Sequence, residues 1–180
     1  LVSSLFTKYI QSTITLNLIE GLIRLIIFFT YLILVSKTED MKRIFMYHGA
    51  EHKTIAAYEH GLDLTGENIK PQCPLHPRCG TSFMFNVMFI SIIVLSFFGS
   101  PNPLMRLLTR LLMLPVIAGI TYELNKLMGR SDSKIAKLAA KPGLFVQKIA
   151  TIKEADDSMI EVAIAAMKPV IPEDEGKDLW

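Results

Sequence analysis

Residues 47–82 read YHGAEHKTIAAYEHGLDLTGENIKPQCPLHPRCGTS, and the rest of the chain is organised around this stretch. It contains every histidine and every cysteine of the protein. Imidazole nitrogens and thiolates are the ligands that zinc prefers. The stretch is therefore the place to look for chemistry, and the first question is how its side chains are presented.

The first part of this stretch predicts a helix that presents two histidines together. At about 100° per residue, His48 and His52 lie one turn apart and project from the same face. Glu51 and Glu59 lie within about 60° of the direction of His48, on the face that carries the apolar positions. His60 lies about 120° away from His48, and we expect it to be a solvated residue at the helix end.

Residues 48–52, HGAEH, match the motif H-x-x-E-H, in which two histidines bind zinc and the glutamate is a general base. A second group of donors follows on a loop stiffened by three prolines, where residues 75–81 read LHPRCGT. Catalytic zinc sites use three protein ligands and keep one position for water, whereas a site with more protein ligands is closed to this chemistry. The predicted ligands are His48 and His52 with one or two of His76, Cys79 and Glu59.

Two interpretations without a metal remain for these side chains. A histidine pair one turn apart can be a hydrogen-bonded helix surface. Cys73 and Cys79 could form a disulfide, but the topology predicted below places them in a reducing compartment, where stable disulfides are rare.

Several short motifs together resemble the YqhQ-like, DUF1385 family of bacterial membrane proteins. They are YHGAEHKTI, YE, ENI, HPRCGTSF, AGITYE, PGL…QK and EVAIAAMK, and they extend over residues 17–168. The resemblance implies a metal-dependent enzyme of unestablished function. The motif positions that it assigns in this chain are His48, Glu51, His52, Glu59, His76, Arg78 and Cys79. Cys73 stands where relatives have another residue.

The amino-terminal region of that family, which is rich in glycine, is not visible here. Residue 1 is Leu and not Met. We therefore expect the chain to be part of a longer protein.

Long apolar runs predict an all-α integral membrane protein with about three transmembrane helices. Hydrophobic residues make up 51% of the chain and charged residues only 20%, and the mean hydropathy is positive. This composition is unusual for a soluble domain and ordinary for a small protein with several spans. The runs are residues 16–36, 82–98 and 104–122. The first is long enough to cross about 30 Å of hydrocarbon, and the second is short but sufficient.

Charged residues inside and beside these runs have open interpretations. Glu20 and Arg24 lie one turn apart and can pair, either facing protein or a water-filled cavity or reaching the membrane interface. Glu123 follows the third run, where we expect an interface carboxylate rather than a ligand.

Basic residues set the predicted orientation. The segment 37–82 contains six Lys or Arg residues, the turn 99–103 contains none, and the chain is basic again after residue 122. By the positive-inside rule, the metal site and the carboxyl-terminal tail both lie on the cytoplasmic side of the inner (plasma) membrane.

We expect a membrane domain over residues 1–130, with a helix-loop metal site at 40–82, and a basic amphipathic and capped helical tail over residues 131–180. Lysines alternate with apolar residues in 133–151, which suits either an anionic lipid surface or a helix packed on the domain. Asp40 is the expected cap of the histidine helix and Gly61 its end. Ser158 and Glu161 form a capping box for a last short helix, and residues 173–180 are an acidic tail.

The predicted function is zinc-dependent hydrolysis of a membrane-associated peptide or lipid. Glu51 would act as general base and Arg78 would stabilise developing negative charge. The alternative is a non-catalytic assembly protein that binds a membrane-protein partner or a second copy of itself through a fold tied by a structural metal. A third possibility is ion passage past Glu20, Arg24 and Glu123. The net charge of only +2 and the dispersed basic residues argue against nucleic acid as a partner.

Overall fold

The computed structural model describes residues 12–98, 102–131 and 133–172. Within these ranges every regular element is helical and no strand occurs, which confirms the all-α prediction. The predicted turn at 99–103 falls largely outside the described residues, and the acidic tail at 173–180 does so entirely. The elements are α2 (Thr13–Val35), α3 (Glu39–Glu59), α4 (Gly66–Ile69), α5 (Gly80–Ser96), α6 (Pro103–Arg130), α7 (Lys134–Val146), the π-helix η1 (Gln147–Thr151), α8 (Asp157–Met167) and the 3-10 turn η2 (Lys168–Val170).

Two of the described helices are long and apolar enough to cross a membrane. They occupy Ile14–Val35 within α2 and Leu104–Arg130 within α6. The third predicted span is the apolar helix α5, which has 17 residues and is shorter than these two. Length and composition therefore support two spanning helices more strongly than three.

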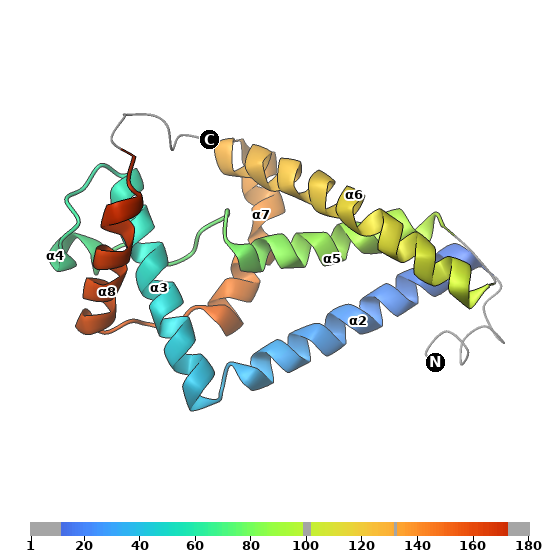
Figure 1. Cartoon of the computed structure of the whole chain (residues 1–180), viewed down its shortest axis with the longest axis horizontal. Helices are drawn as coiled ribbons and strands as arrows, with labels where there is room; N and C mark the ends of the chain where they lie inside the picture. Colours follow the sequence, from blue (N-terminus) through green and yellow to red (C-terminus); the bar gives the residue numbers. More distant parts are fainter. Residues whose placement is uncertain (1–11, 99–101, 132, 173–180) are drawn as a thin grey trace.

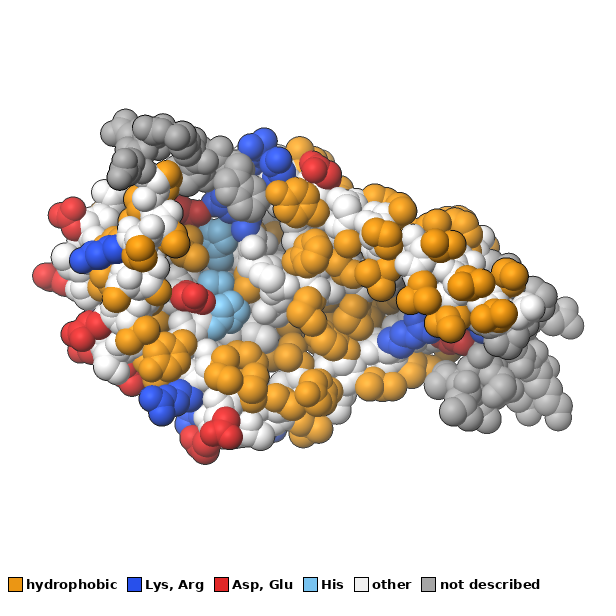
Figure 2. Space-filling view, viewed as in Figure 1, with side chains coloured by type: hydrophobic (Ala, Val, Ile, Leu, Met, Phe, Trp, Pro, Cys, Tyr) orange, Lys and Arg blue, Asp and Glu red, His pale blue; other side chains and the backbone are white. Residues whose placement is uncertain are grey.

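These long helices are not the core of a globular domain. Only 6% of the apolar window of α2 and 11% of that of α6 are buried within the protein. Figure 2 shows hydrophobic side chains spread over the part of the molecule that these helices form. The apolar residues therefore face outward, as they do in helices surrounded by lipid.

A small core lies at the other end of the molecule, where α3, α4 and α8 gather (Figure 1). α8 packs along α3, and α4 lies against both. Buried side chains of modest size fill this core: Ala50, Ala57, Ile69, Met159, Ile160 and Ala163. The core holds α3 in place from one side, while α5 and the α7–η1 segment approach from the other.

The predicted helix caps are confirmed at one of three positions. Gly61 has φ of 68°, a left-handed conformation that favours glycine, and it ends α3 as predicted. Asp40 is not the cap, because Thr38 occupies that position and Asp40 lies in the first turn. α8 is capped by Asp156, whose side chain accepts from the Met159 N–H, and not by the predicted capping box.

The basic segment after residue 133 packs on α5 and α6 as α7. Ala136, Gly143 and Val146 are buried in this contact. Ile135 and Phe145 remain exposed, so one apolar face of α7 is left uncovered. η1 continues α7 toward the histidine helix and contributes the fully buried Gln147.

Candidate metal centre

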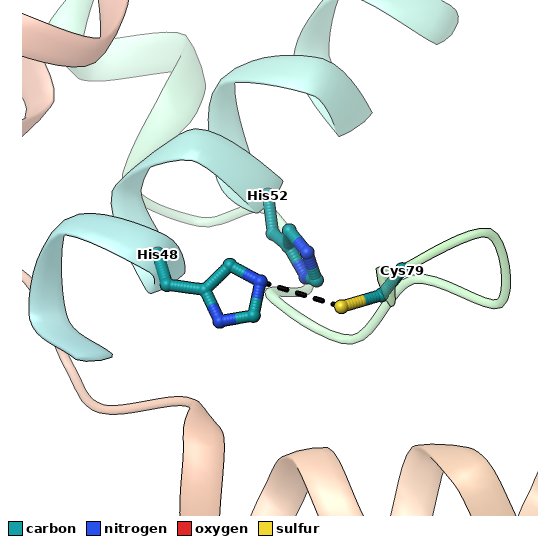
Figure 3. A group of neighbouring side chains, drawn as sticks. All are labelled: His48, His52 and Cys79. Carbon is teal, nitrogen blue, oxygen red and sulfur yellow. Dashed lines mark hydrogen bonds between the residues drawn. The ribbon is translucent and has the colours of Figure 1, made fainter. Parts of the chain in front are cut away.

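Three of the predicted ligands meet at one point. His48 and His52 project from successive turns of α3 toward Cys79, the N-cap residue of α5 (Figure 3). One ligand atom from each of the three residues lies within 4.8 Å of the others, and the rings of His48 and His52 are 4.3 Å apart between centroids. His52 and Cys79 are buried and His48 is half-buried. The sequence prediction that α3 presents both imidazoles on one face is confirmed.

Backbone carbonyls orient both imidazole rings. His48 Nδ1 lies 2.8 Å from the carbonyl oxygen of Thr151, and His52 Nδ1 lies 2.6 Å from that of Pro74. A carbonyl oxygen can only accept a hydrogen bond, so each Nδ1 must carry the proton. The lone pair of a neutral ring is then on Nε2, and in His48 this atom lies 3.3 Å from Cys79 Sγ.

The charges of this group favour a thiolate. Burial raises the pKa of the Cys79 thiol, but interactions with His48 and His52 and the hydrogen bond from the Thr81 N–H outweigh it and lower the pKa to about 5. The hydrogen bond to Cys79 in turn raises the pKa of His48 above its ordinary 6.5, although burial opposes this. Without a metal, these shifts favour a thiolate–imidazolium ion pair between Cys79 and His48.

The donor set and its spacing suit a zinc ion. In a tetrahedral site with Zn–N near 2.0–2.1 Å and Zn–S near 2.3 Å, nitrogen and sulfur ligands lie roughly 3.5–3.6 Å apart. The separation of 3.3 Å between His48 Nε2 and Cys79 Sγ is about 0.2 Å shorter than this, so a small outward movement of the two side chains would admit the ion. Zinc ligands commonly donate their second ring N–H to a backbone carbonyl, as both histidines do here.

Two further predicted ligands, His76 and Glu59, lie beside this group and bind each other. His76 Nε2 is 3.0 Å from a carboxylate oxygen of Glu59. The other oxygen of Glu59 accepts from the guanidinium of Arg78. The stem of Arg78 packs against Gly129 of α6, where a Cβ would stand 2.6 Å from its Cγ. The structure thus separates the predicted donors into a tight His48, His52, Cys79 group and an adjoining pair.

The remaining candidates lie outside the tight group. Glu51 is exposed on α3, and its charge is the smallest of the named contributions to the raised pKa of His48. Cys73 is an exposed free thiol, and Cys79 is also free, so the two form no disulfide. His60 is exposed beside Gln72, as expected for a helix-end residue, and Glu123 is exposed on α6.

The sequence did not predict the contribution of η1, which contacts the loop and the histidine helix at the site. The amide of Gln147 accepts from the His76 N–H at 3.1 Å and donates to the His76 carbonyl at 2.8 Å and to Ser82 Oγ at 2.7 Å. Four residues later, the Thr151 carbonyl orients His48. The sequence feature that could have indicated this segment is the polar residue Gln147 within the PGL…QK motif. No local sequence pattern predicts the π-helix.

A buried lysine ties the loop to the same helix. Lys53 is 5% exposed, and its ammonium donates to the carbonyl of Lys70 at 3.0 Å and to the carboxylate of Glu154. Three segments distant in the sequence are therefore joined at one turn of α3. This ion pair and the π-helix both contact the segments that carry the ligands.

The fold and site define a class: helical proteins with long outward-facing apolar helices and a buried His, His, Cys group. The chain belongs to the family described as a protein of unknown function (DUF1385), whose model matches residues 1–173. Over 154 aligned residues it is 37% identical to the uncharacterized protein YqhQ of Bacillus subtilis (strain 168). The aligned region covers 85% of this chain and 48% of YqhQ. The chain thus spans about half the length of this curated relative. No solved structure matched the chain.

The family membership expected from the motifs is confirmed. Neither the family description nor the name of this relative mentions a metal or an enzymatic activity. The metal-dependent enzyme that the resemblance implied therefore stays a prediction.

Proposed function

We propose that this protein is a membrane-embedded, zinc-dependent hydrolase whose metal is held by His48, His52 and Cys79. The observation that carries the proposal is the orientation of the two imidazoles, because their Nδ1–H groups are committed to backbone carbonyls. The nitrogen left for a metal in His48 faces the thiolate of Cys79. Three protein ligands leave a coordination position for water, as in catalytic zinc sites.

A bound zinc ion would supply Lewis acidity and lower the pKa of a coordinated water toward about 7. Glu51, one residue before His52, is the general base that takes the proton of the attacking water. Arg78 stabilises the negative charge that develops on the substrate, and the carboxylate of Glu59 orients its guanidinium. His76 shares that carboxylate and positions it from the loop.

The proposed location is the inner (plasma) membrane, with the site on the cytoplasmic side. α2 and α6 would cross the bilayer, and α5 would accompany them between these two helices. The site lies where the apolar helices adjoin the polar α3–α8 end (Figures 1 and 2). A peptide or lipid held at the membrane surface would reach this position, which supports a membrane-associated substrate.

A non-catalytic role with a structural metal is the second candidate. It is favoured by how strongly the 62–79 loop is tied to α3, since Pro74, Lys70 and His76 all bond to side chains of that helix. Such a protein would use its exposed apolar helices to assemble with a second copy or with another membrane protein.

Glu51→Gln separates the two functions, because it removes a base without removing a ligand. Zinc-loaded wild type and Glu51→Gln would be incubated with bacterial lipid extract and with a library of membrane-protein peptides, and products followed by mass spectrometry. A hydrolase gives products from the wild type alone, with zinc content equal in both proteins. Absence of products from the wild type, together with release of the 62–79 loop to proteases in His52→Ala, would establish the structural role.

A further inference from the structure

An apolar cavity lies among three helices in the part of the molecule that carries the long apolar helices. α5, α6 and α7 each contribute side chains to it, and its volume is about 590 Å³. Binding sites for small molecules commonly have ~300–1,000 Å³ and mainly apolar walls. His48, His52 and Cys79 are not among its lining residues, so the cavity is separate from the proposed metal centre.

The wall that α5 provides suits a hydrocarbon chain. Phe85, Phe89 and Ile93 follow each other at intervals of four residues, so they share one face of the helix and extend about 12 Å along it at 1.5 Å per residue. The rings of Phe85 and Phe89 stack with their centroids 6.2 Å apart. Phe89 is 50% exposed and Ile93 is 44% exposed, so this wall is open to the surroundings of the helices. In a bilayer those surroundings are hydrocarbon.

Polar groups line the cavity at one end. The start of α5 and the end of α6 lie side by side, at the end of this helix pair that is nearest to α3 (Figure 1). Ser131 and Ser133, which follow α6, line the cavity there, and their hydroxyl oxygens are 3.0 Å apart. Asn86 also lines it, but its amide donates to Asn125 at 2.6 Å. The cavity therefore has a polar mouth at this serine pair and an apolar interior toward Ile93, as an amphiphilic ligand requires.

Exposed cations stand on both sides of the polar mouth. Arg130 comes immediately before the serine pair and Lys134 immediately after it, and both side chains are exposed. Lys141, about two turns further along α7, is exposed as well. The acidic residue of this segment, Asp132, lies outside the described residues, and one carboxylate cannot balance three cations. The mouth of the cavity is therefore positively charged.

The course of α7 suits the boundary between headgroups and hydrocarbon. α7 runs across the ends of α5 and α6 and does not continue along them (Figure 1). Its side chains Leu138 and Phe145 are 64% and 62% exposed, and Lys134 and Lys141 lie within about 60° of both around the helix. The stem of a lysine can follow such an apolar surface while its ammonium group reaches the headgroups. Helices with this pattern lie in the interface plane of a membrane.

We propose that this cavity binds one acyl chain of an anionic phospholipid, whose headgroup lies at the serine pair between Arg130 and Lys134. The planar guanidinium matches phosphate oxygens two at a time, and the ammonium group adds a second positive charge. A second copy of the chain packed symmetrically on this face would bring the same cations together, which disfavours a dimer as the occupant. The inference rests on the proposed membrane location and not on the metal centre.

Binding would be measured by native mass spectrometry on detergent-purified protein, titrated with phosphatidylglycerol or with phosphatidylcholine that carries the same chains. The cations at the mouth predict that the first phosphatidylglycerol binds about tenfold more tightly than the first phosphatidylcholine. Equal affinities for the two lipids would overturn the proposal. The measured quantity is lipid binding and not turnover or zinc content, so failure here is distinguishable from failure of the proposed metal centre.

A bulky side chain inside the cavity tests where the acyl chain lies. Ala139 lines the cavity, so Ala139→Phe should fill part of it and weaken binding of the first phosphatidylglycerol about tenfold. Ala166→Phe makes the same change at an exposed position of α8 and should alter binding less than twofold. Unchanged binding by a folded Ala139→Phe would show that the acyl chain does not enter the cavity.

Charge variants locate the headgroup and give an answer even if Ala139→Phe fails to fold. Arg130→Gln with Lys134→Gln removes two exposed cations and should reduce the affinity for phosphatidylglycerol to that for phosphatidylcholine. Arg43→Gln with Lys168→Gln removes the same two residue types from exposed positions of α3 and η2, and it should keep the preference. A preference that persists without Arg130 and Lys134 would overturn the proposal. A dimer that Ala139→Phe dissociates would also overturn it and identify a second copy of the chain as the occupant.

Discussion

Two imidazole rings, His48 and His52, carry most of the functional argument at the scale of residues. Their spacing in the sequence places them on one face of a helix, and this much could be predicted. Which nitrogen is available to a metal depends on the carbonyls of Thr151 and Pro74. Those carbonyls come from distant segments. Every residue has a backbone carbonyl, so the sequence does not indicate which ones accept a hydrogen bond from the imidazoles.

The pKa of Cys79 is the first property to test. In metal-free protein carrying Cys73→Ser, thiolate absorbance near 240 nm should appear with a midpoint near pH 5, against 9.0 for an ordinary thiol. His48→Ala should raise the midpoint, because it removes a partner of the thiolate. A midpoint near 9 in the otherwise intact protein would rule out the ion pair.

The same pair makes stability depend on pH in two directions. Between pH 5 and 9 the unfolded chain keeps the Cys79 proton that the folded protein has lost. The contribution of Cys79 is therefore complete above pH 9 and is lost as the pH falls through 5. His48 has a raised pKa, so its contribution is complete below pH 6.5 and is lost as the pH rises through its folded value.

Gly49 tests how closely α3 is packed beside the ligands. A Cβ at this position would stand 2.3 Å from the carbonyl oxygen of Lys153, which is backbone and cannot turn away. Gly49→Ala should therefore destabilise the protein by about 2–3 kcal/mol, measured as a lower midpoint of unfolding. Gly66→Ala is the control, since nothing lies within 4 Å of its Cβ position. Equal midpoints for the two variants would contradict the packing described here.

At the scale of elements, the positions of the helices could be predicted well, but the contacts between them could not. The apolar runs gave α2, α5 and the first two thirds of α6, and the i, i+4 spacing of His48 and His52 indicated α3. The π-helix η1 could not be predicted, because Gln147 is stabilised by bonds to His76 and Ser82 across more than sixty residues. Its role follows from tertiary contacts alone.

A substitution of Gln147 tests whether η1 positions the metal site. Gln147→Leu leaves the His76 backbone and Ser82 buried without their partner, which should cost about 1–3 kcal/mol of stability. Because the loop then holds Cys79 less firmly, zinc affinity should fall about 10–100-fold. The exposed neighbour Lys148→Leu should leave zinc affinity unchanged. Wild-type affinity in Gln147→Leu would show that the π-helix does not position the site.

At the scale of the whole molecule, the helices form a polar end around α3, α4 and α8 and an apolar part around α2, α5 and α6 (Figure 1). Composition alone predicted the apolar part. The packing of α3 against α8 could not be predicted, because the alanines at their contact do not indicate which helix they pack against. The proposed metal centre lies where these two parts meet.

Labelling of Cys73 tests the proposed orientation of the protein in the membrane. It is exposed on the loop beside the site, whereas Cys79 is buried. A membrane-impermeant maleimide should label wild type in inside-out vesicles and not in intact cells, and Cys73→Ser should abolish the labelling. Labelling in intact cells would place the site on the outer side and reverse the predicted topology.

The most direct measurement is the zinc content of detergent-purified protein by mass spectrometry, comparing wild type with His48→Ala, His52→Ala and Cys79→Ala. We expect about one zinc per chain in the wild type, as for a site with three protein ligands. His60→Ala should keep this zinc, and each ligand variant should lose it. Wild-type protein that stays free of metal after incubation with zinc would show that there is no metal centre and leave the histidines as hydrogen-bonding residues of a helical scaffold.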